Sequence, residues 1–134
     1  MVRKMKQHRN SRQRQIILQA VMERHDHPTA DDIYLDVRSE DEKISRGTVY
    51  RNLGVLTDSG QIGLVKLPTA DRFDFRTDYH YHLLCSGCRK VFDIPEEYHK
   101  ELDDQTAADT GFLINRHRIL FEGLCPECRE KEPD

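Results

Sequence analysis

Apolar residues in the first half of the chain recur at helical spacing in three stretches, residues 12–25, 29–37 and 45–60. Residues three or four apart lie on one face of an α-helix, so each stretch predicts an amphipathic helix. The positions that carry the pattern are Ile16, Ile17, Ala20, Val21, Ile33, Val37, Val49, Leu53 and Leu56. Three short helices in this order predict a helix-turn-helix body.

Capping residues separate these helices. His27 and Pro28 interrupt the first helix. Thr29 is a suitable N-cap for the second, with Asp32 at the third position of a capping box. Ser45 caps the third helix and Gly60 ends it.

After the helices the apolar period changes to that of strands. Residues 62–75 contain two alternating runs joined by a turn with a proline, which predicts a β-hairpin wing. The rest of the chain reads as strands at 79–85 and 89–95, a helix over 95–111 stopped by a glycine, and a strand over 112–125. The predicted class is α+β: a winged helix-turn-helix domain over 1–75, a linker over 76–79 and a small α/β domain over 80–134.

Composition narrows the protein class. None of the 134 residues belongs to an apolar run near the roughly 20 residues that a membrane span requires. The start is basic but lacks the apolar core of a secretory signal, so we expect a reducing, cytoplasmic location and no membrane partner. Four cysteines in two C-x-x-C pairs are then better explained as metal ligands than as disulfides.

Charge is divided unevenly along the chain. Residues 1–66 carry 12 Lys and Arg against 9 Asp and Glu, whereas residues 67–134 carry 9 against 15. The basic start, which includes Arg12 and Arg14, is either a solvated tail or an arm that follows phosphates. In the third helix Arg46, Thr48, Tyr50 and Arg51 occupy the first two turns, together with Asn52. A recognition helix meets DNA with this part of its surface, although a solvated polar face looks similar.

The cysteine pairs Cys85/Cys88 and Cys125/Cys128 predict one structural zinc site. His80 and His82 precede the first pair and could complete a site with it. The second pair is the better partner for the first, because it repeats the same C-x-x-C turn, called a knuckle below. Four thiolates close the zinc shell and leave no position for a substrate. Gly87, between the first two cysteines, is expected to permit the tight turn.

His80 and His82 alternate in an extended segment and so project from one face, where they form a bidentate pair. Asp74, Asp93 and His27 are the available partners. Three imidazoles and two carboxylates suit Fe(II), Mn(II) or Zn(II). Each of these residues taken singly is also ordinary, so spacing alone leaves this second site open.

Five segments in this order resemble the ferric uptake regulator (Fur) superfamily, and most closely its peroxide-sensing PerR branch: "HPTADDIY", "GTVYRNL", "RFDF", "HYHLLCSGC" and "GLCPEC". The resemblance implies a homodimeric metalloregulator that represses transcription at double-stranded operator DNA when its regulatory metal is bound. It implies structural Zn(II) on Cys85, Cys88, Cys125 and Cys128, and regulatory Fe(II) or Mn(II) on His27, Asp74, His80, His82 and Asp93. Tyr50 and Arg51 correspond to the base-reading pair. Family members usually have an additional helix before the segment that starts at Ser11, and the basic arm would take its place.

Asp74 and Tyr81 indicate the branch, because the iron-sensing branch usually has Glu at the first position and an acid at the second. The resemblance then implies that peroxide, as a signal rather than a substrate, oxidises His27 and His80 through bound iron. An iron- or manganese-responsive repressor without peroxide sensing is the alternative. A metal-dependent hydrolase is a third hypothesis, but the chain has no HExxH motif and no general base placed beside the histidine pair, so we do not expect an enzyme.

Overall fold

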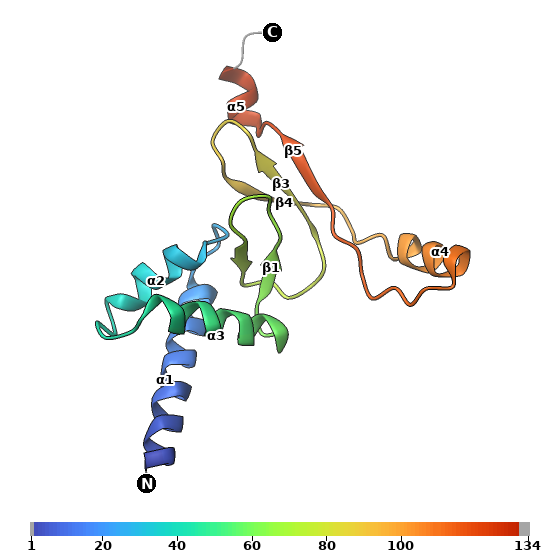
Figure 1. The fold of residues 1–134 in the computed structure, drawn as a ribbon. Helices are drawn as coiled ribbons and strands as arrows, with labels where there is room; N and C mark the ends of the chain where they lie inside the picture. Colours follow the sequence, from blue (N-terminus) through green and yellow to red (C-terminus); the bar gives the residue numbers. More distant parts are fainter. Residues whose placement is uncertain (1, 132–134) are drawn as a thin grey trace. The chain divides into compact units, whose positions relative to one another are not determined.

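The computed structural model describes residues 2–131, which divide into two compact units with the boundary between Asp78 and Tyr79 (Figure 1). The first unit carries three helices and a two-stranded sheet, and the second carries a three-stranded sheet and two helices. None of the described helices is both long and apolar enough to cross a membrane.

The first unit begins with α1 (Val2–Glu23), followed by α2 (Ala30–Arg38) and α3 (Arg46–Asp58). All three predicted helices are present, but α1 starts about ten residues earlier than the sequence pattern indicated. The basic start is therefore part of α1. The reason is local: from Val2 to Glu23 there is no Gly or Pro, and Lys, Arg, Gln and Met favour helix.

The helices enclose one apolar core. Its members are less than 9% exposed and include all but two of the apolar positions predicted from periodicity, the exceptions being Ile16 and Ala20, which are partly buried. Fully burying an aliphatic side chain contributes about 1.5–3 kcal/mol, so this core dominates the stability of the unit. The buried residues are Ile17, Val21, Ile33, Val37, Ile44, Val49, Leu53, Leu56, Ile62 and Phe73.

The predicted caps are also confirmed. The Thr29 hydroxyl accepts the Asp32 backbone N–H at 3.1 Å, and the Asp32 carboxylate accepts the Thr29 N–H at 3.0 Å, which completes the capping box. The Ser45 hydroxyl accepts the Thr48 N–H at 3.1 Å. Gly60, with φ 77°, follows the end of α3 in the left-handed region.

The wing consists of β1 (Gly63–Val65) and β2 (Arg72–Asp74), which pair antiparallel and put Gly63 opposite Asp74. Strand β2 is also tied to the start of α2, since the Phe73 N–H donates to the Pro28 carbonyl at 2.8 Å. Together with the three helices, this hairpin confirms the winged helix.

The second unit is a sheet of order β4-β3-β5, from β3 (Tyr81–Cys85), β4 (Val91–Ile94) and β5 (Leu120–Gly123). Strands β3 and β4 are antiparallel and place His82 opposite Asp93. Strands β3 and β5 are parallel, which requires a crossover, and α4 (Lys100–Thr110) lies in that connection. The predicted α/β domain is therefore confirmed.

Three element boundaries differ from the sequence pattern. Helix α4 begins at Lys100 rather than at residue 95, because the His99 N–H donates to the Tyr81 hydroxyl and the Tyr98 hydroxyl accepts the His117 N–H. The expected strand over 112–125 is reduced to β5, and residues 112–119 have no regular structure. Residues after Cys125 form a short helix, α5 (Pro126–Lys131), that the sequence did not predict, although proline favours the first position of a helix.

Candidate metal centres and the exposed face of α3

The four cysteines converge in the second unit. Their sulfur atoms all lie within 4.8 Å of one another, and the Cys88 and Cys125 sulfurs are 4.0 Å apart. Zinc in tetrahedral coordination has Zn–S bonds of about 2.3 Å, which puts neighbouring sulfurs about 3.8 Å apart. The parallel pairing of β3 with β5 brings the two knuckles together, since Cys85 lies opposite Gly123, two residues before Cys125. The group fits Zn(II).

Within this cluster, backbone N–H donors lower the pKa of one cysteine, and neighbouring thiols raise the pKa of another. The Cys85 sulfur accepts the N–H groups of Cys125 and Cys88, each at 3.4 Å, and these bonds lower the pKa of Cys85 to about 6. Hydrogen bonds with Cys125 and then Cys85 raise the pKa of Cys128 to about 12. Four thiolates at this spacing repel one another, so the complete set requires a cation.

Gly87 is needed for a different reason from the one expected. Its backbone does not have the positive φ that favours glycine. A β-carbon there would instead lie 2.9 Å from the Cys128 sulfur and 3.0 Å from the Cys128 β-carbon. The second knuckle therefore occupies the space where a side chain at residue 87 would be.

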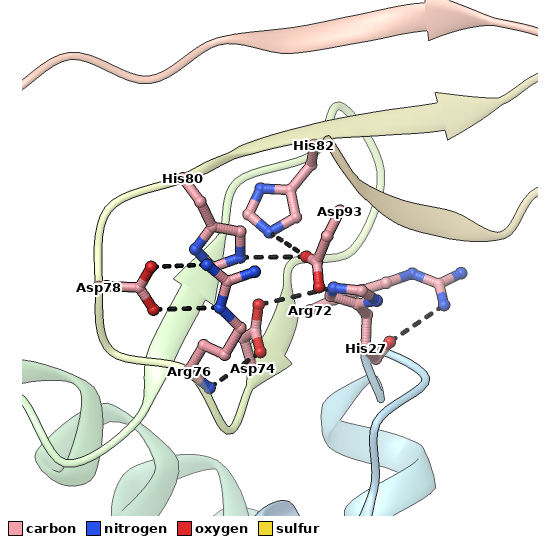
Figure 2. A network of polar contacts seen from close by, with 8 residues as sticks. All are labelled: His27, Arg72, Asp74, Arg76, Asp78, His80, His82 and Asp93. Atoms are coloured by element: carbon pink, nitrogen blue, oxygen red, sulfur yellow. Dashed lines mark hydrogen bonds and ion pairs between the residues drawn. The ribbon is translucent and has the colours of Figure 1, made fainter. Parts of the chain in front are cut away.

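In the first unit His27 and Asp74 form a buried pair. His27 Nε2 lies 3.5 Å from Asp74 Oδ2, and the side chains are 6% and 3% exposed. His27 has φ 54°, a left-handed conformation that costs a non-glycine residue energy and is common at functional sites. The Arg72 guanidinium donates to the His27 carbonyl at 3.2 Å, and the Arg76 N–H donates to Asp74 Oδ1 at 2.9 Å (Figure 2). These contacts hold the imidazole and the carboxylate in place.

In the second unit His80, directly before β3, and His82, within β3, face one carboxylate. His80 Nε2 and His82 Nε2 lie 3.0 and 3.4 Å from Asp93 Oδ1, and the two rings are 4.4 Å apart between centroids (Figure 2). The alternation of β3 and its register with β4 produce this arrangement. Imidazoles and a carboxylate at such distances are ligands for Fe(II), Mn(II) or Zn(II).

The opposite face of β3 carries a polar network that sequence reasoning missed. The Tyr81 hydroxyl accepts the His99 N–H at 2.9 Å and lies 2.6 Å from His117 Nε2. His117 Nδ1 lies 2.7 Å from Asp103, and the Tyr98 hydroxyl donates to the same carboxylate. These bonds tie α4 and the segment before β5 to the sheet. Alternation placed Tyr81 on this face, but no pattern indicated its partners.

The first two turns of α3 expose part of the predicted DNA surface. Arg46, Tyr50 and Arg51 are exposed and Thr48 is half-buried. Asn52 was expected on this surface but is only 3% exposed. It accepts a hydrogen bond from Arg14 Nε at 3.0 Å and donates to the Thr48 carbonyl at 2.9 Å, so both it and Arg14 join α1 to α3. Arg12 is exposed on α1.

The chain is similar to metal-responsive regulators. Residues 5–122 match the family model described as "Ferric uptake regulator family". The peroxide-responsive repressor PerR of Staphylococcus saprophyticus is 41% identical over 123 residues, which cover 89% of this chain and 81% of that protein. The protein of the same name from Staphylococcus aureus is 39% identical with the same coverage.

Solved structures show the same fold. The Campylobacter jejuni peroxide stress regulator has a TM-score of 0.74, covers 96% of this chain and 98% of its own, and is 24% identical. The Helicobacter pylori ferric uptake regulator Fur also has a TM-score of 0.74, with coverage of 97% and 91% and 20% identity.

Proposed function

Because this chain belongs to the ferric uptake regulator family, we propose that it is a homodimeric repressor that binds operator DNA when Fe(II) or Mn(II) is bound, and that it senses peroxide. The observation that carries the proposal is that each unit has a group of imidazoles and carboxylates. The first unit has His27 and Asp74, and the second has His80, His82 and Asp93. The names of the curated relatives support the peroxide branch. A four-thiolate zinc site requires reduced cysteines, which supports a cytoplasmic location.

The regulatory ligands divide between the two units, and this division provides a switch. A metal that takes ligands from both units favours those positions of the winged helix in which every ligand reaches the metal. Ligand binding shifts a conformational equilibrium by as much as its affinity differs between the states. In a dimer the favoured state has its two recognition helices spaced for two half-sites.

Helix α3 is the element that we propose to enter the major groove. Arg46 and Arg51 supply charge, and Tyr50 supplies an aromatic ring with a hydroxyl, on an exposed face. The same face has Gly54, where an added β-carbon would meet nothing within 4 Å. Glycine in a helix interior costs roughly 0.5–1 kcal/mol relative to alanine, so a glycine that the fold does not require is consistent with close approach of DNA. Arg12 and Thr48 flank this surface.

Exposed apolar side chains in the second unit support self-association. Leu102 is 45% exposed, Phe112 69%, Leu113 89% and Phe121 43%. Four large apolar side chains exposed on so small a unit are consistent with an interface. A homodimer formed by this unit would remove them from water.

Peroxide sensing requires an oxidisable ligand beside a metal that activates peroxide, and Fe(II) held by these residues would catalyse the transfer of oxygen, with the two electrons coming from the imidazole. His27 and His80 are the proposed targets. Each imidazole gains one oxygen atom from peroxide, and the second oxygen leaves as water. The oxidised side chains bind the metal less well, so repression is lost. The cysteines are spared because thiolates in a closed zinc shell are less available than free ones.

Three measurements on the zinc-loaded protein test this function. DNA binding is compared with and without Mn(II), and equal affinity would exclude metal control. Peptide mass spectrometry after peroxide treatment of the Fe(II) and Mn(II) forms should find one added oxygen at His27 and His80 in the iron form only. Unmodified histidines with repression intact would instead favour an iron- or manganese-responsive repressor. Hydrolysis of a phosphoester in the absence of DNA binding would favour an enzyme.

A further inference from the structure

One carboxylate oxygen in the first unit holds two side chains of α3. Asp31, in the first turn of α2, accepts from Arg46 Nη1 at 2.6 Å and from the Tyr50 hydroxyl at 2.7 Å, both through Oδ1. The Arg46 guanidinium also lies over the Tyr34 ring, 4.5 Å from its centroid. A cation and a phenol on the exposed face of α3 are therefore both bound to an acid before any other molecule arrives.

The fold does not need this cluster. The Asp31 and Arg46 side chains are each 59% exposed and Tyr50 is 50% exposed, so water screens these contacts and they contribute little to stability. An acid in the first turn of a helix is favourable, but Asp32 already supplies one within the capping box of α2. The start of α3 has its own cap in Ser45. The cluster therefore adds little to the stability of α2 and α3 beyond what these local features already provide.

Its geometry has two consequences for a polyanion that approaches α3. A phosphate must compete with Asp31 for Arg46, and the Asp31 charge repels every phosphate regardless of base sequence. The Tyr50 ring, by contrast, is already oriented, because its hydroxyl is engaged by the carboxylate. The same hydrogen bond raises the pKa of Tyr50, so the hydroxyl remains protonated. Orienting a contact residue in advance lowers the entropy lost on binding.

We propose that Asp31 is a specificity-determining residue: it weakens sequence-independent binding to phosphates and holds Tyr50 ready for contact with base edges. The proposal rests on the DNA-binding function proposed above. Specificity is a difference of affinities, and a repulsive element against wrong partners increases it. Asp31 provides that repulsion and a positioning contact at one point of α3.

Two substitutions separate these roles in the full-length protein loaded with zinc and Mn(II). Asp31→Asn removes the charge but keeps an oxygen that can accept from Tyr50, whereas Asp31→Ala removes both. Asp36→Asn is the matched control, since Asp36 is an exposed acid of the same helix that pairs with an arginine away from α3, Arg24 at 3.3 Å. The probes are a duplex selected by the wild-type protein from a random-sequence pool and a shuffled duplex of equal length and composition.

Fluorescence anisotropy at several salt concentrations gives the affinity for each duplex. Asp31→Asn should bind the shuffled duplex roughly three- to tenfold more tightly, as expected for removing one charge near a phosphate. If Arg46 gains a phosphate, the salt slope should steepen by roughly 0.9. Asp31→Ala should in addition lose affinity for the selected duplex, and Asp36→Asn should change the ratio of the two affinities less than twofold.

An unchanged affinity of Asp31→Asn for the shuffled duplex, or an unchanged affinity ratio in Asp31→Ala, would overturn the proposal. An equal effect of Asp36→Asn would reduce it to a general effect of net charge and would overturn it as well. A wild-type protein that selects no duplex with Mn(II) bound would refute the proposed function itself, and this result is separate from either variant's behaviour.

Discussion

Replacing Gly87 by alanine is a direct test of how the two zinc knuckles fit together. The added β-carbon would lie 2.9 Å from the Cys128 sulfur, 3.0 Å from the Cys128 β-carbon and 3.3 Å from Leu124 Cδ2. Ordinary contact between such atoms is about 3.5–4.0 Å, so one knuckle must move by roughly 0.5 Å or more. Metal–ligand distances tolerate only about 0.2 Å. The knuckles can then no longer present four sulfurs to one ion without strain.

We expect zinc affinity in Gly87→Ala to fall roughly ten- to a hundredfold, the range found when groups that support metal ligands are lost. Competition with a chromophoric chelator at neutral pH measures this change. Gly123→Ala is the matched control in the same unit, because a β-carbon there would meet nothing within 4 Å. Wild-type zinc affinity in Gly87→Ala, or an equal loss in Gly123→Ala, would refute the steric argument.

Three other substitutions have defined outcomes. In Gly63→Ala the new β-carbon would overlap the Arg76 carbonyl oxygen and must displace the chain beside Asp74, so Mn(II) titration should show weaker binding with zinc content unchanged. An unaltered Mn(II) affinity would contradict this. Gly54→Ala has free space and should raise the free energy of unfolding by roughly 0.5–1 kcal/mol while weakening DNA binding, which thermal melting and anisotropy measure. Higher stability with undiminished DNA affinity would show that DNA does not approach this residue. Tyr98→Phe removes the bond that chiefly holds the pKa of Asp103 below its ordinary value. That stability is present above the ordinary pKa of an aspartate and is lost as pH falls through the folded pKa, so the difference in Tm from wild type should be largest at neutral pH and vanish in acid. A difference that is the same at every pH would argue against a role of the Asp103 charge.

Features that depend on neighbours within about four residues could be predicted from the sequence. The capping box of Thr29 and Asp32 and the cap at Ser45 are of this kind, because their hydrogen bonds close within one helical turn. The shared face of His80 and His82 follows equally from the two-residue period of a strand. The pairing of two C-x-x-C knuckles follows from the preference of zinc for four ligands.

Features that depend on distant segments required the tertiary structure. Asn52 has a polar side chain at a position that could have faced solvent, and only its contact with Arg14 shows that it belongs to the junction of α1 and α3. The start of α4 is set by two such contacts: the His99 N–H donates to the Tyr81 hydroxyl in β3, and the Tyr98 hydroxyl accepts the His117 N–H.

The sequence by itself thus determined the order of the elements as far as β5, the caps of α2 and α3 and the chemistry of the candidate ligands, because periodicity and side-chain type are local properties of the chain. The tertiary structure alone decided that Gly87 is required for space beside Cys128 and that Asp31 binds Arg46 and Tyr50. These contacts join residues 15 to 41 positions apart, and their geometry arises only when packing of the core and pairing of the strands bring the segments together.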